Sequence, residues 1–262
     1  LSWNSGGSSQ AYLRFANSSG NIQLFNDTAG ETDTSVISTQ VVRDPAAWYN
    51  FVIAIDTTQG SAEDRLKFYV NGTLQEVEAS ISGGSLQADT EMAQNYDLGF
   101  LTASKHQIGM NVESSNSEPF DGYLSEFHFV DGQQYDPTYF GKFDDNGVWV
   151  PVKPGTGEGG TISYGNNGFL LEFKQTGTSQ NSSGMGADTS GNDNHFSASG
   201  LNDRDVVVDT PTNNFMVMNP IYTNSRGAFT EGNCQVTTNV QGSVPYGQVE
   251  FGTFAVNKGK WY

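Results

Sequence analysis

Residues 48–56 read WYNFVIAID and residues 66–77 read LKFYVNGTLQEV, and these two stretches decide the fold class. The first is a mostly apolar run of the length of one β-strand. The second holds two strand-like runs on either side of Asn71-Gly72. Asn-Gly tolerates positive φ at both central positions of a type I′ turn, whose twist matches that of paired strands. The sequence therefore predicts a strand followed by a tight β-hairpin.

Similar short runs continue on both sides of this centre. Residues 11–15 and 22–25 flank the polar residues 17–21, which predicts another hairpin. Residues 106–110 and 120–130 also have strand character, and apolar side chains occur on both faces of the latter run. A strand of that kind suits a sandwich of two packed sheets. We therefore expect an all-β, antiparallel fold.

The composition agrees with this interpretation. The 262 residues include 31 Gly, and the 17 Phe, 11 Tyr and 4 Trp are more aromatic residues than a disordered chain carries. Turn-forming residues combined with aromatic residues favour strands over helices. The composition excludes a helical bundle.

The charge balance narrows the class of partner. Twelve basic residues stand against 29 acidic ones, which gives a formal net charge of -17. A field of that sign repels phosphate backbones and anionic membranes, so we expect no nucleic-acid partner. The sequence has no apolar run near 18 residues, so we expect no membrane insertion. Cys234 is the single cysteine, which excludes an intramolecular disulfide.

The amino-acid composition changes after about residue 153. Residues 154–160, PGTGEGG, have the composition of a flexible linker. Residues 169–173 read as a strand before the polar stretch 174–203, and short apolar anchors follow at 206–208 and 215–218. A lone strand cannot bury its apolar side chains, so we expect this one to pair with the sandwich or with a neighbouring copy of the chain.

The sequence thus predicts four parts. A sandwich over residues 1–135 precedes a segment over 136–152, in which Asp136 and Pro137 begin a short helix and residues 143–152 leave the sandwich. An extended β-arm over 153–219 and a β-rich module over 220–262 follow.

Two groups of residues resemble known families. Residues 48–58 with 64–72 are similar to the W-x-x-V-x-x-x-D and R-x-K-x-Y-V-N-G core of laminin-G-like and concanavalin-A-like lectin jelly rolls, and residues 120–126 resemble the closing strand of that fold. This resemblance implies a jelly roll over residues 1–135. The chain departs from the family pattern at its N-terminus, where the usual opening strand lies upstream of Leu1 or is missing.

A second resemblance is more specific. A string of motifs occurs in the order found in large tailed-phage proteins of the tail fibre, appendage or virion structural kind. It runs VDGQ at 130–133, YDP at 135–137, FG at 140–141, GVWVP at 147–151, NGF at 167–169, DTSGNDN at 188–194 and DTPTNN at 209–214. Residues 253–256 and 259–262 are similar to the start of the SPRY-like domain that often follows in those proteins.

This resemblance implies a non-enzymatic virion protein. Its partners would be further copies of itself in a homotrimer, other virion proteins and host surface polysaccharide. Trimer packing would let each arm cover an edge strand of the next sandwich, and an arm folded back on its own sandwich is the alternative. A rival interpretation is a secreted carbohydrate-active enzyme, or a bacterial adhesin, that carries a lectin-like module. Glu31 and Asp33 begin the carboxylate pattern of a glycosidase strand, but the second Glu is missing.

Two sets of residues are candidates for a site. Glu126 and His128 share a strand face, where they could bind a sugar or transfer a proton, or form a structural pair. Asp188, Asn192 and Asp193 carry the oxygen ligands that calcium prefers, or they cap the local backbone as Asx turns. Calcium is thus the one cofactor suggested. The aromatic residues considered for stacking on a sugar are Trp3, Tyr96, Tyr135 and Tyr222.

Overall fold

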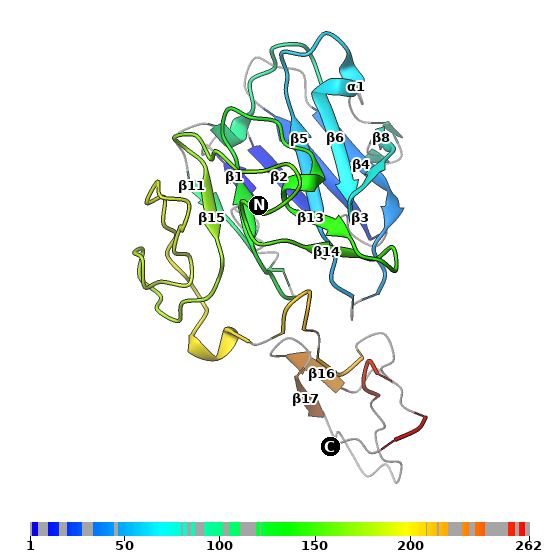
Figure 1. The fold of residues 1–262 in the computed structure, drawn as a ribbon, viewed down its shortest axis with the longest axis vertical. Coiled ribbons are helices and arrows are strands. Elements are labelled where there is room, and N and C mark those ends of the chain that lie inside the picture. The colour runs from blue at the N-terminus through cyan, green and yellow to red at the C-terminus, as the bar shows by residue number, and fades with distance from the viewer. Residues whose placement is uncertain are drawn as a thin grey trace.

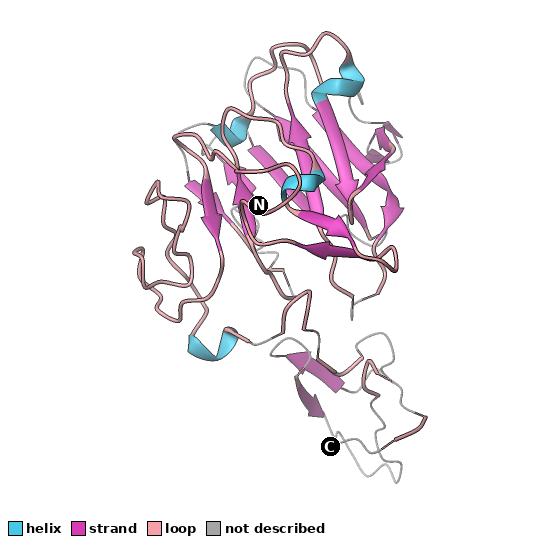
Figure 2. Cartoon of the chain, viewed as in Figure 1, coloured by secondary structure: helices cyan, strands magenta, loops and turns pink. Residues whose placement is uncertain are grey.

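The structure is a computed structural model. It describes residues 2–4, 10–15, 20–27, 34–44, 47–79, 81–82, 85–86, 92–101, 105–110, 119–120, 122–207, 209–213, 215–219, 227–230, 234–238, 251–254 and 257–259. Strands and loops dominate these residues, and the helices are single short turns (Figure 2). The prediction of an all-β, antiparallel fold is confirmed.

A six-stranded antiparallel sheet forms one layer of a sandwich. Its order is β11 (Lys105–Gln107), β1 (Ser2–Asn4), β2 (Gln10–Phe15), β3 (Asn21–Asp27), β4 (Thr34–Val41) and β8 (Val77–Ala79). β2 and β3 pair with Leu13 opposite Leu24, which confirms the hairpin predicted around residues 17–21. Strand β1 precedes this hairpin within the described residues.

A three-stranded antiparallel sheet forms the second layer (Figure 1). It consists of β5 (Phe51–Ile55), β6 (Leu66–Val70) and β7 (Thr73–Gln75), with the short helix α1 (Ala62–Arg65) between β5 and β6. Asn71 has φ 47° and Gly72 has φ 74°, as a type I′ turn requires. The central hairpin predicted from the sequence is therefore present.

The core lies between these two sheets. Its buried residues from the six-stranded sheet are Ala11, Ile22, Leu24 and Val36, and those from the three-stranded sheet are Leu66 and Phe68. Met92, Tyr96 and Phe100 complete the cluster from the segment that contains the 3₁₀ turn η1 (Gly99–Leu101). Asn26 is fully buried there. Its side-chain nitrogen donates to the Tyr96 hydroxyl at 3.0 Å, and its side-chain oxygen accepts from the Gly99 backbone amide at 2.9 Å.

The segment after β12 (Phe127–Phe129) covers the outer face of the three-stranded sheet (Figure 1). Val52 and Ala54 alternate with the core-facing residues of β5, yet both are buried. The covering segment holds the 3₁₀ turn η2 (Pro137–Tyr139) and a hairpin of β13 (Gly141–Phe143) with β14 (Trp149–Pro151). Gln134 ties it to α1, which connects β5 and β6, by donating to the Asp64 carbonyl at 3.1 Å.

The prediction that residues 143–152 leave the sandwich is therefore wrong. The Trp149 ring lies against Gly72 and Gly141, so closely that a Cβ added at Gly72 would meet it at 2.3 Å. Gly72 and Gly141, which are far apart in the sequence, thus leave the space that the Trp149 indole occupies. The helix predicted at Asp136 is present as η2, and the Asp136 carboxylate accepts from the Thr138 amide at 2.8 Å.

The arm begins in contact with η2 rather than as a flexible linker. The Gly159 amide donates to the Thr138 carbonyl at 3.3 Å. A Cβ added at Gly157 would lie 2.3 Å from the Thr138 carbonyl oxygen, and one at Gly159 would lie 2.2 Å from the Tyr139 ring. The glycines of this stretch permit close packing, and the prediction of a flexible linker from composition is wrong.

The arm then pairs with its own sandwich. β15 (Phe169–Leu171) is buried and runs antiparallel to β12, and Phe169 packs against Phe127, Phe129 and Phe196. Phe129 in turn packs against the core of the sandwich. The alternative of an arm folded back on its own domain is therefore the one that the structure has. Of the strand predicted over 120–130, the described residues have strand structure over 127–129, and Glu126 immediately before it adopts a left-handed φ of 53°.

Beyond β15 the arm consists of loops joined by isolated bridges, such as Gly186 with Phe196, and ends near η3 (Asp203–Asp205). Leu201, Val207 and Met216 are exposed and Val206, Val217 and Met218 are half-buried, so the described residues of the short apolar stretches do not lie in the core. The remaining described strands form hairpins of β9 (Ile81–Ser82) with β10 (Ser85–Leu86) and of β16 (Gly227–Thr230) with β17 (Gln235–Thr238). Among the described residues, no helix is long and apolar enough to cross a bilayer.

Candidate functional site

Two acidic residues and a histidine gather at one end of the β12–β15 pair. Because Phe127 pairs with Leu171, Glu126 just before β12 lies next to Glu172 just after β15. His128 is on β12, and its Nε2 lies 4.0 Å from Glu126 Oε2. The two residues predicted as a site, Glu126 and His128, are thus brought together.

The His128 ring is held firmly in place. Its Nδ1 lies 2.8 Å from the Tyr164 hydroxyl, and the two rings stack with centroids 6.0 Å apart. Phe140 contacts the imidazole edge-on at 5.1 Å. The His128 side chain is only 13% exposed, so its orientation is determined by these aromatic neighbours.

The surroundings keep the Tyr164 phenol protonated. Burial raises its pKa well above the ordinary value, and the negative charges of Glu126, Asp188 and Glu172 raise it further. A protonated phenol can donate its hydrogen to His128 Nδ1, while the other ring nitrogen, Nε2, faces Glu126. Tyr164 therefore orients the His128 ring so that Nε2 faces Glu126.

Glu172 stays ionised at the same site. Burial acts against its charge, but hydrogen bonds from Lys174 and Thr189 and the charge of His128 outweigh it and lower the pKa of Glu172. Lys174 forms a direct ion pair with this carboxylate. This end of the strand pair therefore presents the ionised carboxylate of Glu172 as a hydrogen-bond acceptor close to His128.

The backbone is strained next to each of the two strands, at Glu126 before β12 and at Phe173 after β15. Glu126 has φ 53° and Phe173 has φ 52°, and left-handed backbone costs a residue with a side chain about 1–2 kcal/mol. Strained residues of this kind cluster at functional sites. We therefore treat Glu126, His128, Tyr164 and Glu172, called here the β12–β15 corner, as the candidate functional site.

This corner has the groups to bind a neutral sugar. The Glu126 side chain is 32% exposed and that of Glu172 is 22% exposed, so both carboxylates can accept hydrogen bonds from hydroxyl groups in solution. Sequence reasoning missed Tyr164 and Glu172 because neither lies near Glu126 in the chain. The predicted strand over 169–173 was the one signal that could have placed Glu172 beside it.

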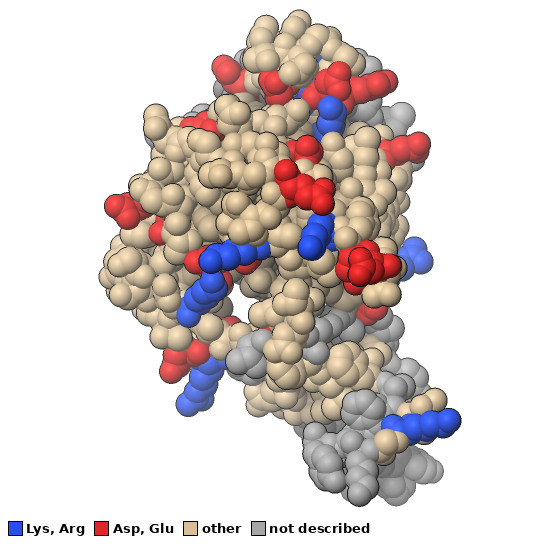
Figure 3. Space-filling view, viewed as in Figure 1, with Lys and Arg blue, Asp and Glu red and all other residues tan. Residues whose placement is uncertain are grey.

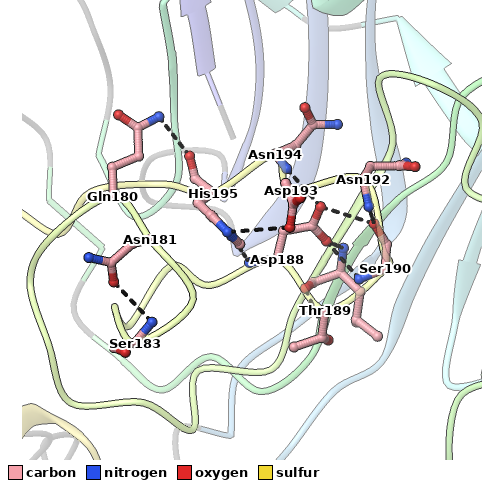
Figure 4. A network of polar contacts seen from close by, with 11 residues as sticks. Gln180, Asn181, Ser183, Asp188, Thr189, Ser190, Asn192, Asp193, Asn194 and His195 are labelled. Carbon is pink, nitrogen blue, oxygen red and sulfur yellow. Dashed lines mark hydrogen bonds and ion pairs between the residues drawn. The ribbon is translucent and has the colours of Figure 1, made fainter.

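Asp188, the first calcium candidate, is buried and already has its full set of donors (Figure 4). Oδ1 accepts from the amides of Leu170 at 2.9 Å and Ser190 at 2.8 Å. Oδ2 accepts from the Ser190 hydroxyl at 3.0 Å and the Asn194 amide at 2.9 Å. Both oxygens point at hydrogens, which leaves no lone pair directed at a cation.

The other two calcium candidates do not join Asp188. Asn192 uses its amide nitrogen to donate to the carbonyls of Gly165 at 2.6 Å and Gly168 at 2.9 Å. The Asp193 side chain is 89% exposed and lies 3.6 Å from His195 Nε2. Within the described part of the chain, no group of acidic, histidine or cysteine side chains could hold a metal ion. Asp188 therefore forms an Asx turn with the Ser190 amide, Asn192 and Asp193 bond elsewhere, and the three side chains do not converge on one cation position.

The motifs of the arm are bonded to one another. Asn194 donates to the Gly168 carbonyl at 3.0 Å, and Asn167 donates to the Asp131 carboxylate at 2.8 Å. A Cβ at Gly168 would lie 1.9 Å from the Tyr164 carbonyl oxygen, so only glycine fits there. The VDGQ, NGF and DTSGNDN motifs thus form one interlocked scaffold, which positions Tyr164 for the β12–β15 corner.

The remaining candidates do not form a second site. Tyr96 is 3% exposed in the core, and Tyr135 packs against Tyr139 while its hydroxyl accepts from the Ser163 amide. The Trp3 side chain, Tyr222, Glu31 and Asp33 lie outside the described residues. Comparison with models of protein families, with curated proteins and with solved structures found no match to this chain.

Proposed function

We propose that this chain is a structural and adhesive virion protein of a tailed bacteriophage, part of a tail fibre, spike or surface appendage. The observation that carries the proposal is the interlocked scaffold of residues 130–194. The motifs shared with phage appendage proteins are used here to fasten the arm onto the sandwich through side-chain bonds to carbonyl groups and backbone amides. Rigid fastening of this kind suits a part that withstands force outside a cell.

The surface supports a role in recognising neutral glycans. Most of the face in Figure 3 carries uncharged side chains, with scattered acidic residues and few basic ones. The β12–β15 corner adds two carboxylates and a histidine that can bond to hydroxyl groups. We propose host surface polysaccharide as the ligand and other virion proteins as partners. The homotrimer that we propose as the assembled state rests on the resemblance to fibre-like phage proteins, because β15 pairs with its own sandwich and does not supply the contact between copies.

One experiment tests the location in the virion. Particles are purified from a culture that carries the gene and are labelled with gold-conjugated antibody against this chain. We expect gold on an appendage of the particle. Label confined to the particle-free supernatant would overturn the virion proposal. Sedimentation of the purified chain measures its assembly, and a monomer at micromolar concentration would overturn the trimer.

The rival function is a carbohydrate-active enzyme, and the carboxylates beside His128 are the observation that favours it. The purified chain is incubated with a panel of bacterial surface polysaccharides, and bound chain and released reducing ends are both measured. We expect binding without new reducing ends, and Glu126→Gln should weaken that binding. Release of reducing ends that is lost in Glu126→Gln or Glu172→Gln would replace the adhesive proposal with the enzymatic one.

A further inference from the structure

The chain contains three Asn-Gly dipeptides, at Asn71, Asn146 and Asn167, and the fold treats them differently. Asn-Gly is the sequence at which an asparagine side chain most readily cyclises, because glycine leaves the attacking backbone nitrogen unhindered. We propose that Asn146, in the turn of the β13–β14 hairpin, is a site of spontaneous covalent modification by deamidation, and that the fold protects the other two.

The reaction needs only water. The Gly147 nitrogen attacks Cγ of Asn146, the new C–N bond closes a succinimide ring, and the side-chain nitrogen leaves as ammonia with the proton that the Gly147 nitrogen gives up. Water then opens the ring at either carbonyl. One product has aspartate at position 146, and the other has isoaspartate, in which the chain continues through the side chain. No oxidant or reductant takes part.

Asn71 is protected by its place in the sandwich. Its side-chain oxygen accepts from the Asn50 backbone amide at 2.8 Å, and the backbone amide of Asn71 donates to the Asn50 carbonyl at 2.9 Å. The Trp149 ring covers Gly72, the residue that would supply the attacking nitrogen. Cyclisation would require the side chain to leave Asn50 and the backbone of a packed turn to rotate.

Asn167 is protected by the scaffold of the arm. Its amide nitrogen, the leaving group of the reaction, donates to the Asp131 carboxylate at 2.8 Å, and its backbone amide donates to the same oxygen at 3.3 Å. Gly168 is buried and has no room to move, since its Cα faces the Tyr164 carbonyl. This dipeptide therefore cannot reach the geometry of attack without opening the arm.

Asn146 is held more weakly than the other two asparagines. Asn146 and Gly147 are exposed, and apart from its chain neighbours no residue has an atom within 4 Å of the position of a Cβ at Gly147. The Asn146 amide nitrogen lies 3.5 Å from Asp144 Oδ2, at the limit of a hydrogen bond. One turn bond holds the attacking nitrogen, from the Gly147 amide to the Asp144 carbonyl at 2.9 Å, and it lies in a solvent-exposed turn.

The modification would alter the hairpin that seats Trp149. Asp144 accepts from the amides of Asn146 at 2.9 Å and Val148 at 2.8 Å, and it lies beside Asp145. Either product adds a negative charge to this acidic turn. Isoaspartate also lengthens the backbone between Asp144 and Val148, which displaces the bonds that close the hairpin.

The test is peptide mapping of the full chain after incubation at mildly alkaline pH and 37 °C, with aspartate and isoaspartate products quantified at all three positions. We expect conversion at Asn146 to exceed that at Asn71 by about fivefold or more, because the firm side-chain bond of Asn71 to the Asn50 amide has only a 3.5 Å contact as its counterpart at Asn146, and one hydrogen bond contributes about a factor of five. In urea the three positions should convert at similar rates. Equal native rates, or a slower rate at Asn146, would overturn the proposal.

A variant tests whether the structure causes the difference. Trp149→Ala uncovers Gly72 and should raise conversion at Asn71 about fivefold or more while leaving Asn167 slow. Asn167 serves as the internal control, since general unfolding would raise its rate as well. No rise at Asn71 in a variant whose Asn167 stays protected would show that the Trp149 cover is not what protects Asn71. Asn146→Gln should remove the fast reaction altogether.

Discussion

Replacing Asp188 by asparagine tests whether the interlocked scaffold depends on one buried carboxylate. The side chain is 6% exposed and receives four hydrogen bonds, two at each oxygen. Asp188→Asn turns one oxygen into an amino group, which then faces a backbone amide instead of accepting from it. Hydrogen bonds to a charged group contribute about 1.5–3 kcal/mol each, so losing two, with partial recovery as the Ser190 hydroxyl rotates, should cost about 3 kcal/mol.

Asp193→Asn is the matched control. It makes the same change of charge in the same loop at a side chain that is 89% exposed, and it should cost less than about 0.5 kcal/mol. Hydrogen exchange read by mass spectrometry measures the effect locally, at the amides of Leu170 and Asn194. A 3 kcal/mol loss raises exchange there by about two orders of magnitude. Equal exchange in the two variants would refute the reasoning.

Three further outcomes follow from the same structure. The donors around Asp188 outweigh burial and lower its pKa, so its contribution to stability is present above the unfolded value of about 3.9 and is lost as pH falls through the lower folded value; urea titrations from pH 6 to pH 2 should show a smaller loss in Asp188→Asn than in the parent chain, because Glu172, whose pKa is also lowered, still titrates in the variant. Gly72→Ala drives a Cβ into Trp149 and should cost about 2–4 kcal/mol in urea unfolding, whereas Gly155→Ala, with φ 79° and open space, should cost about 1 kcal/mol. Phe169→Ala should cost about 3–5 kcal/mol and open the arm to protease, and an arm that stays resistant would contradict the packing described for β15.

The elements that the sequence predicts well are those set by neighbouring residues. The hairpin around Asn71-Gly72 is specified by two residues and by the alternation beside them, and Asp136 with Pro137 specifies its own short turn. Residues 143–152 show the opposite case. Whether Trp149 packs inward depends on Gly72, which is far away in the chain and gives no local sign of accepting an indole.

The candidate site divides in the same way. Glu126 and His128 are two positions apart, so their proximity is visible in the sequence even though the left-handed backbone at Glu126 is not. Tyr164 and Glu172 join them only through the pairing of β15 with β12. Asp188 has the composition of a calcium ligand, and only the donors around it, including one from β15, show that it binds the backbone instead.

The pairing of β12 with β15 has a consequence for synthesis on the ribosome. Phe129 ends β12 and Leu171 ends β15, so 171 − 129 = 42 residues must be added before the strand pair can be completed. At 5–20 residues per second this takes about 2–8 s, and the sandwich can fold within that time. Until then β12 presents an unpaired strand edge with two phenylalanines, which is a template for pairing with another nascent chain. Mispairing at the β12 edge is therefore a risk during translation, and this risk ends once β15 has paired with β12.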